Sequence, residues 1–383
     1  MAQPPQYILH SVQPENNKDT YTEFDQLSFL LTHPNRKLVG NSVRLCGDLE
    51  VKKNNVKLGP TQKLYFDESV GVMSIVDHIT TSFQNVGQVE SYTGMPRLAC
   101  MIEDTTTNTN DMMNSENVCE MKSPLKELTL MNMIGDYPDV SNNLSTDDFN
   151  QPSSFSFKPL FCLNATSGVK GGDTSVSFKK TGSVRITMTL NRTEQVFQGA
   201  DNANNVSYSI KNVRLQYLSV PEDNKANKTL HRIKYYLKQS VLSSQSNISS
   251  KIPAVCSGVS CSFIRQDKEA TYADNSLRRE VFSNLDSLEF LFQNNTSEYI
   301  SYALEDREEI VARYIESVAE TGHNRLSLRN LAGNNNYGIG LSFGGQVIDL
   351  RNQIFNMNFR SSDTTISSRP YSMHMFFHSF VEL

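Results

Sequence analysis

Apolar and polar residues alternate along much of this chain, and a period of two is typical of β-strands with one buried face. In the first clear run Val43, Leu45 and Leu49 are apolar, while Arg44 and Asp48 between them are polar. The same pattern recurs at 184–190, 208–217, 288–292, 355–359 and 371–383. The sequence therefore predicts a mainly β protein.

Two of these runs depart from simple alternation. The run at 208–217 changes phase between Ile210 and Val213, which predicts a β-bulge at that point. The last run also carries Phe376 and Phe380 on its second face. We therefore expect the final strand to be buried on both sides.

Helical periodicity is confined to short segments. Between residues 304 and 320, Ile310, Tyr314 and Val318 recur at every fourth position with charged residues opposite them. Gly322 stands where a C-terminal helix cap belongs. Shorter helices are expected at 96–103 and 123–135.

The two halves of the chain have the same order of predicted elements: strands first, then a helical segment, then further strands. The stretch from Gly199 to Asn205 is polar and rich in turn-forming residues, so it is the expected boundary. We predict an N-terminal arm at 1–19, a first jelly roll at 20–199 and a second jelly roll at 205–383. The predicted fold is two tandem antiparallel jelly-roll β-sandwiches with short helical insertions.

Composition narrows the possible functions. A formal net charge of −5 argues against coating nucleic acid, so we expect no direct sequence-specific contact with it. Trp is absent, which excludes a Trp-based sugar platform. Residues 1–13 lack the pattern of a secretory signal, and no apolar run approaches the ~20 residues of a membrane-spanning helix. We therefore expect synthesis in the cytosol or nucleus of the producing cell.

The cysteines do not form a metal-binding pattern. There are six, none in a CxxC pair and none with a histidine at zinc-ligand spacing. Cys46 and Cys162 fit small core positions. Cys256 and Cys261 are near enough in sequence to form a disulfide, but a reducing compartment favours free thiols.

Three stretches together resemble the double jelly-roll major capsid proteins of tectivirus-like phages, polinton-like viruses and virophages. Residues 155–164 with 182–190 resemble the closing strands of a first jelly roll, 208–218 the opening strand of a second, and 337–344 with 376–383 its final strands. The resemblance implies a virion protein whose homotrimer forms a pseudo-hexagonal capsomer. It also implies contacts with neighbouring capsomers and with minor or penton capsid proteins, and it allows an internal membrane beneath the shell.

Motifs of common enzymes are missing, so we expect no catalytic, cofactor-binding or metal-ligating residues and no cofactor. His374 and His378 are four residues apart, but on a strand this spacing favours core or interface histidines over a zinc site. The glycines from Gly338 to Gly345 lie in a strand-like run, which favours a turn or bulge over a phosphate-binding loop.

Other functions remain open at this stage. The chain could be a minor or penton capsid protein, or a jelly-roll module that binds a ligand or glycan through loops such as 222–229. A cupin-like metal enzyme is the least favoured, because cupins need several ligands on neighbouring strands. The remaining histidines are isolated in the sequence: His10, His33, His78, His231 and His323.

Overall fold

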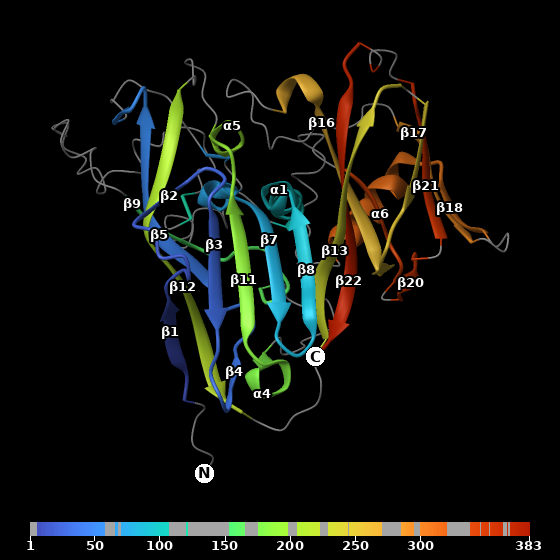
Figure 1. Cartoon of the computed structure of the whole chain (residues 1–383). Helices are drawn as coiled ribbons and strands as arrows, with labels where there is room; N and C mark the ends of the chain where they lie inside the picture. Colours follow the sequence, from blue (N-terminus) through green and yellow to red (C-terminus); the bar gives the residue numbers. More distant parts are fainter. Residues whose placement is uncertain are drawn as a thin grey trace.

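The computed structural model describes residues 6–57, 66–67, 70–106, 120–121, 153–164, 175–197, 205–222, 229–243, 245–269, 285–294, 299–319, 338–344, 346–351, 353–362, 366 and 368–383. These residues form two β-sandwiches that stand side by side, with their strands running along a common direction (Figure 1). The expected helix at 123–135 lies outside the described residues, and so does Gly322, the expected cap of the helix at 304–320.

The first sandwich faces two antiparallel sheets against each other. Its four-stranded sheet has the order β3 (Gln26–Leu31), β11 (Val184–Leu190), β7 (Val76–Phe83), β8 (Gly87–Thr93). The other sheet is built around β12 (Val206–Pro221) and contains β1 (Ile8–Val12), β2 (Thr20–Thr22), β4 (Arg36–Leu38), β5 (Arg44–Lys53), β6 (Val56–Lys57), β9 (Ser153–Phe157) and β10 (Val176–Ser177).

The second sandwich has two four-stranded sheets. One has the order β13 (Thr229–Val241), β22 (Tyr371–Glu382), β16 (Gly258–Arg265), β19 (Ile339–Ser342). The other has the order β14 (Gln245–Lys251), β21 (Gln353–Ser361), β17 (Leu285–Asn294), β18 (Tyr299–Leu304). A small pair, β15 (Val255–Cys256) and β20 (Ile348–Asp349), lies outside these sheets. Eight strands that cross repeatedly between two sheets in this order make a jelly roll, which confirms the predicted fold class.

The expected boundary between the sandwiches is wrong. Strand β12, which was predicted to open the second jelly roll, pairs with β5, β1, β2 and β4 and therefore closes the first. The chain passes to the second sandwich between Pro221 and Thr229. The polar, turn-rich composition of 199–205 predicts a linker, but in chain order this stretch falls between β11 and β12, which both belong to the first sandwich. Local composition does not distinguish a connection within one sandwich from a connection between two.

The expected N-terminal arm at 1–19 is also partly wrong, because Ile8–Val12 pairs in register with β12 from Ser219 to Leu215. The predicted β-bulge in β12 is confirmed. Its pairing with β5 shifts register between Lys211 and Arg214, and Asn212 adopts a left-handed backbone conformation with φ of 50°.

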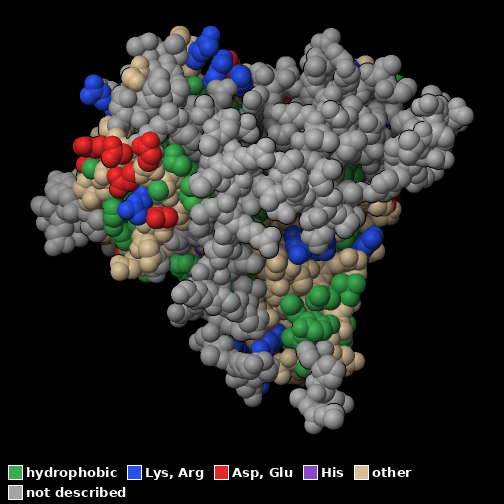
Figure 2. Space-filling model, turned by 180° about the vertical axis from the view of Figure 1, so that it is seen from behind, with side chains coloured by type: hydrophobic (Ala, Val, Ile, Leu, Met, Phe, Trp, Pro, Cys, Tyr) green, Lys and Arg blue, Asp and Glu red, His purple; other side chains and the backbone are tan. Residues whose placement is uncertain are grey.

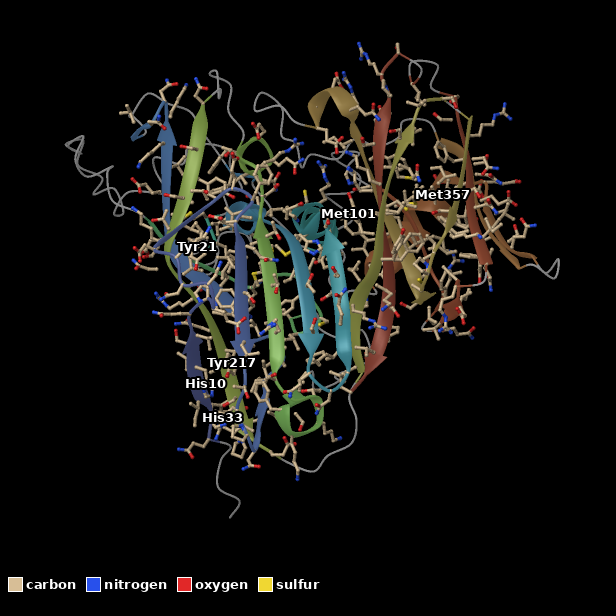
Figure 3. The ribbon with its side chains drawn as sticks, in the orientation of Figure 1. His10, Tyr21, His33, Met101, Tyr217 and Met357 are labelled. Atoms are coloured by element: carbon tan, nitrogen blue, oxygen red, sulfur yellow. The ribbon has the colours of Figure 1, made fainter. Side chains whose placement is uncertain are left out.

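Each sandwich encloses an apolar core made by the inward residues of the alternating runs. Ile186 on β11 and Phe290 on β17 are completely buried, one in each core. In Figure 3, Tyr21 and Met357 mark the two sandwiches. The final strand β22 is buried along most of its length on both faces, as predicted.

Two helices lie between or beside the sandwiches. Helix α1 (Met95–Thr106) follows β8, and helix α6 (Arg307–Ala319) follows β18. Ile310, Tyr314 and Val318 of α6 are buried, which confirms the predicted apolar stripe. The short helices are η1 (Gly71–Ile75), α4 (Phe178–Thr181), α5 (Thr193–Val196) and η4 (Gln266–Lys268). Among the described helices, none combines the length and apolar character needed to span a membrane.

Glycine lets α6 approach β19 closely. A Cβ at Gly340 would lie 2.0 Å from Ser317 Oγ, and a Cβ at Gly338 would lie 1.9 Å from the backbone oxygen of Cys261. Only Gly344 of this group has a positive φ, 66°, among its described members. The predicted turn is therefore present at Gly344, while Gly338 and Gly340 serve close packing.

Candidate functional site

The two sandwiches meet where an edge strand of each comes together. Strands β8 and β13 lie side by side (Figure 1), joined by side chains and not by a β-ladder. Glu90 Oε1 accepts a hydrogen bond from the backbone N–H of Ile233 at 2.9 Å. In return, Arg232 Nη1 donates to the carbonyl oxygen of Val89 at 2.8 Å. Each strand therefore contributes one charged side chain that satisfies a backbone group of the other.

The contact between β8 and β13 is called the joint below. The carboxyl group of Glu90 is buried in it. Burial raises the pKa of Glu90 to about 7, against the opposing effects of N–H donors from Cys162 and Ile233 and the charge of Arg232. The second oxygen, Oε2, accepts from Cys162 N at 2.8 Å. A buried carboxyl group with both oxygens occupied fixes its three neighbouring segments relative to one another.

A second polar cluster links α1 to the second sandwich. Arg97 of α1 is buried and its Nη2 lies 3.7 Å from Glu269 Oε1. The same carboxylate accepts from Lys238 Nζ at 2.6 Å, and His374 Nε2 lies 3.3 Å from it. Burial alone would raise the pKa of Glu269, but His374, Lys238 and Arg97 together hold it well below its usual range. The cluster orients α1 on the outer face of the sheet that contains β22.

Apolar packing seals the joint. Leu230 and Ile233 of β13 and Phe376 of β22 belong to the same continuous core as the first sandwich. The ring of Phe376 meets that of Tyr92 edge-on, with centroids 6.4 Å apart. Because core residues cross from one half to the other, the two sandwiches share one hydrophobic interior at this point.

The two predicted structural histidines are buried, as expected. His378 Nε2 lies 2.6 Å from Ser260 Oγ, and its Nδ1 lies 3.1 Å from His231 Nε2. His374 Nδ1 lies 2.7 Å from the hydroxyl of Tyr236. Burial lowers the pKa of both His374 and His378 to about 3, so both rings are neutral at pH 7.

Other candidate residues do not converge on a chemical centre. His10 stacks on Tyr217 at 4.7 Å and lies 5.2 Å from the ring of His33, so these sequence-distant histidines are neighbours (Figure 3). The described residues contain no group of three or more potential metal ligands. Cys256 and Cys261 are free thiols, as expected, and burial raises the pKa of Cys256 to about 12.

The outer edges of the molecule are open. Among the described strands, β18 pairs only with β17, and β1 and β2 pair only with β12. These two edges lie on opposite sides of the molecule in Figure 1. Tyr7 and Leu9 beside β12 are 59% and 61% exposed, and Phe24 just after β2 is 66% exposed. Exposed apolar residues along an unpaired edge are typical of an interaction surface.

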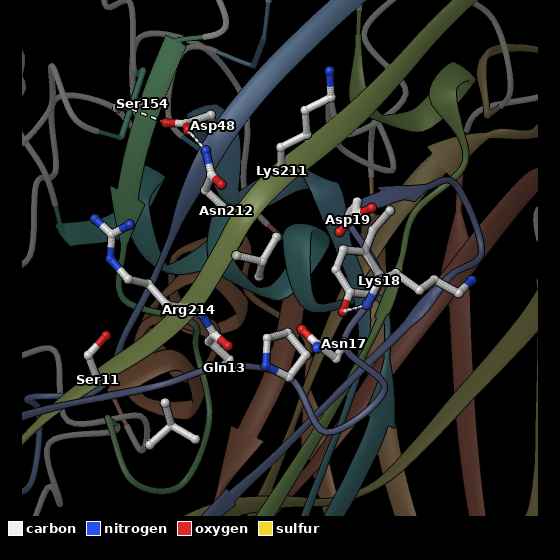
Figure 4. A pocket seen from close by; sticks show the side chains of 14 residues that line it. Ser11, Gln13, Asn17, Lys18, Asp19, Asp48, Ser154, Lys211, Asn212 and Arg214 are labelled. Atoms are coloured by element: carbon white, nitrogen blue, oxygen red, sulfur yellow. Dashed lines mark hydrogen bonds between the residues drawn. The ribbon is translucent and has the colours of Figure 1, made fainter.

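A groove of about 1020 Å³ opens between β1 and β2, beside the bulge in β12 (Figure 4). Its floor holds Asp48, which accepts from Asn212 Nδ2 at 2.6 Å and from Ser154 Oγ at 2.7 Å. Lys211 is paired with Glu50 at 2.9 Å. Arg214 is exposed and has no ion pair with any described residue.

The solvent side of α6 is acidic. Glu308, Glu309 and Glu316 are exposed, and Arg313 pairs with Glu316 at 2.8 Å and with Glu309 at 4.0 Å. Figure 2 shows acidic side chains gathered on the side of the molecule that carries the second sandwich. The charged residues predicted opposite the apolar stripe therefore lie on the solvent side of α6.

Sequence reasoning missed the joint. Strand β8 was not predicted, and nothing in the local pattern singles out Glu90 or Arg97 as buried. The one available signal was the apolar run from Leu98 to Ile102 that follows Arg97, whereas Glu90 has the single apolar neighbour Val89. The loop at 222–229, considered for ligand binding, lies mostly outside the described residues.

No protein-family model and no curated protein matches the chain. Solved structures do. VP54 of PBCV-1, in a crystal structure fitted into a cryo-EM reconstruction of the virophage Sputnik, matches with a TM-score of 0.57 and 9% identity over 100% of this chain and 96% of that one. The Faustovirus major capsid protein matches with a TM-score of 0.57 and 9% identity, over 100% and 91%. The mavirus major capsid protein matches with a TM-score of 0.50 and 11% identity, over 98% and 90%. The chain therefore has the double jelly-roll fold of these viral capsid proteins.

Proposed function

We propose that this protein is a structural subunit of an icosahedral virus shell, in which three copies form a pseudo-hexagonal capsomer. The observation that carries the proposal is the joint between the sandwiches. Glu90, Arg232 and Arg97 tie two jelly rolls into one rigid pair, so that each copy presents two similar units in a fixed relation. Three such pairs supply six units around one axis.

The fold comparison supports the same role over the whole chain. Major capsid proteins of Faustovirus and mavirus match it nearly end to end, with most of their own length covered. In the part of the chain that the structure describes, β18 and the β1–β2 edge have no further strand partner, and unpaired edges of this kind suit a subunit that works in an assembly. We propose that its partners are neighbouring capsomers and minor or penton capsid proteins, and that its role is structural and not catalytic.

Purified full-length protein tests this proposal. Light scattering coupled to size-exclusion chromatography should give three times the mass of the 43.2 kDa chain, and negative-stain images should show hexagonal outlines. A protein that remains monomeric at all accessible concentrations contradicts a capsid role and favours a ligand- or glycan-binding module. A trimer without hexagonal outlines contradicts the pseudo-hexagonal arrangement alone.

A further inference from the structure

Each sandwich has the same two edge strands: one ends a four-stranded sheet, and the other lies beside the closing strand. Within the chain, an edge of the first kind from the first sandwich contacts an edge of the second kind from the second sandwich. Strand β8 ends the sheet β3-β11-β7-β8, and β18 ends the corresponding sheet β14-β21-β17-β18. Strand β13 pairs antiparallel with β22, which closes the second sandwich, as β1 and β2 pair with β12, which closes the first. Within the chain β8 meets β13. Among the described strands, none pairs with the other side of β18 or of the β1–β2 edge.

We propose that β18 of one copy lies against the β1–β2 edge of a second copy, with the acidic first turn of α6 at the groove beside Arg214. This contact would repeat between copies the arrangement that β8, α1 and β13 make within one chain. The inference rests on the proposed function and names the surfaces by which the copies join. Because the two edges are different and lie on opposite sides, the contact is head-to-tail and can close a ring.

The exposure of apolar residues at the start of β13 and at the start of β1 supports the proposed contact between copies. Strand β13 begins with Thr229 opposite Glu382, near the end of its closing strand, and β1 begins with Ile8 opposite Ser219, near the end of its own. At the start of β13, Leu230 is buried by the first sandwich. At the start of β1, Tyr7 and Leu9 are mostly exposed. The β1 edge therefore exposes apolar residues at the position where, in β13, the equivalent residue is covered by the first sandwich.

The helices that follow the two strands give a second line of support. Helix α1 begins directly after β8 and lies against Tyr236, which pairs with Phe376. Phe376 lies six residues before Glu382 in β22. Six residues before Ser219 in β12 lies Val213, which lines the groove. Helix α6 follows β18 as α1 follows β8, so in the proposed contact its first turn reaches the groove of the second copy.

The proposed contact brings opposite charges together at Arg214. The groove also contains Asp19 and Asp48, and Asp48 accepts hydrogen bonds from Asn212 and Ser154. Glu308 and Glu309 in the first turn of α6 are exposed, and Arg214 in the groove is exposed without an ion pair among the described residues. Within the chain, Arg97 of α1 faces Glu269 at 3.7 Å. Between copies the acidic group would lie on the helix and the basic group on the sheet. Such pairs fix orientation and contribute to the rate of association.

Charge reversal tests the contact. Arg214→Glu and, separately, Glu308→Lys with Glu309→Lys should each raise the concentration of half-dissociation about tenfold, and combining all three changes should restore association. Lys179→Glu, an exposed change on α4, is the matched control and should leave association unchanged. Unchanged melting temperatures would show that the variants fold.

Cross-linking gives an independent readout. Leu9 on β1 and Ala303 on β18 are both exposed. A mixture of Leu9→Cys and Ala303→Cys chains should form a disulfide-linked dimer under mild oxidation, while either variant alone should form much less. If the wild-type chain never associates, this inference and the proposed function both fail. If it forms trimers that the charge variants leave intact, with no cross-link in the mixture, this inference alone is overturned.

Discussion

At the scale of single residues, the buried carboxyl group of Glu90 makes the stability of the fold depend on pH. It lies between the two sandwiches, and its pKa of about 7 is above the ordinary value of 4.5. Between these two pH values the folded chain holds a proton that the unfolded chain has lost. The stability that this proton provides is therefore complete below about pH 4.5 and is lost as the pH rises through 7.

Replacing Glu90 by Gln should change this pH dependence. The amide is uncharged at every pH, so the free energy of unfolding of the variant should rise relative to wild type between pH 5 and pH 8. The expected slope is at most about 1.4 kcal/mol per pH unit. Urea titrations at the two pH values measure the difference. Parallel pH profiles for the two proteins would show that Glu90 does not titrate in this range.

Arg232 provides a second prediction at the scale of one side chain. Arg232→Ala removes the donor to Val89 and the positive charge beside Glu90. Loss of a charged donor to a backbone carbonyl costs about 1–3 kcal/mol. Chemical denaturation should show this loss, whereas Arg185→Ala, which removes an exposed pair with Glu15, should cost less than about 1 kcal/mol. Equal losses in the two variants would contradict the assigned role of the joint.

At the scale of elements, the contact of α6 with β19 depends on the absence of a side chain at Gly340. Gly340→Ala would place a methyl group 2.0 Å from Ser317 Oγ and 2.9 Å from the backbone oxygen of Val259. We expect α6 to be displaced and the protein to lose about 1–3 kcal/mol of stability. Thermal unfolding measures this, with Ser342→Ala on the same strand as a control. A melting temperature equal to that of the control would show that the helix adjusts freely.

Strand β22 supports a stronger prediction. It pairs with β13 on one side and β16 on the other, and it is buried on both faces. Deleting residues 376–383 removes the partners of both strands at one end and opens the joint at Phe376. The truncated chain should lose its cooperative unfolding transition and fail to form trimers. Normal trimers from the truncated chain would show that this end of β22 is dispensable.

For the whole molecule, the sequence predicted those strands in which apolar and polar residues alternate over several positions, and it missed others such as β3, β7 and β8. The alternating runs at 184–190 and 288–292 place Ile186 and Phe290 on the buried face, because polar neighbours such as Arg185 and Glu289 mark the opposite face, and both residues are fully buried. The bulge at Asn212 left a visible change of phase. The joint could not be predicted, because Glu90 meets Ile233 across 143 positions in the chain, and local pattern carries no information about such a contact.

The same limit explains the misplaced boundary. The residues before β12 are polar, and β12 itself alternates as any strand of either sandwich would. Only its hydrogen bonds to β5 assign it to the first sandwich. The architecture of two jelly rolls was therefore accessible from pattern and resemblance, while the assignment of this strand required the pairing itself.

The position of β12 has a consequence for synthesis on the ribosome. This last strand of the first sandwich runs between β5 on one side and β1 and β2 on the other, so that sheet cannot close until residue 221 has emerged. Strand β22 imposes the same delay on the second sandwich until residue 382 is made. Until then, each nascent half exposes unpaired strand edges, which favours association with other chains. We therefore expect both halves to be most dependent on chaperones shortly before their final strands are translated.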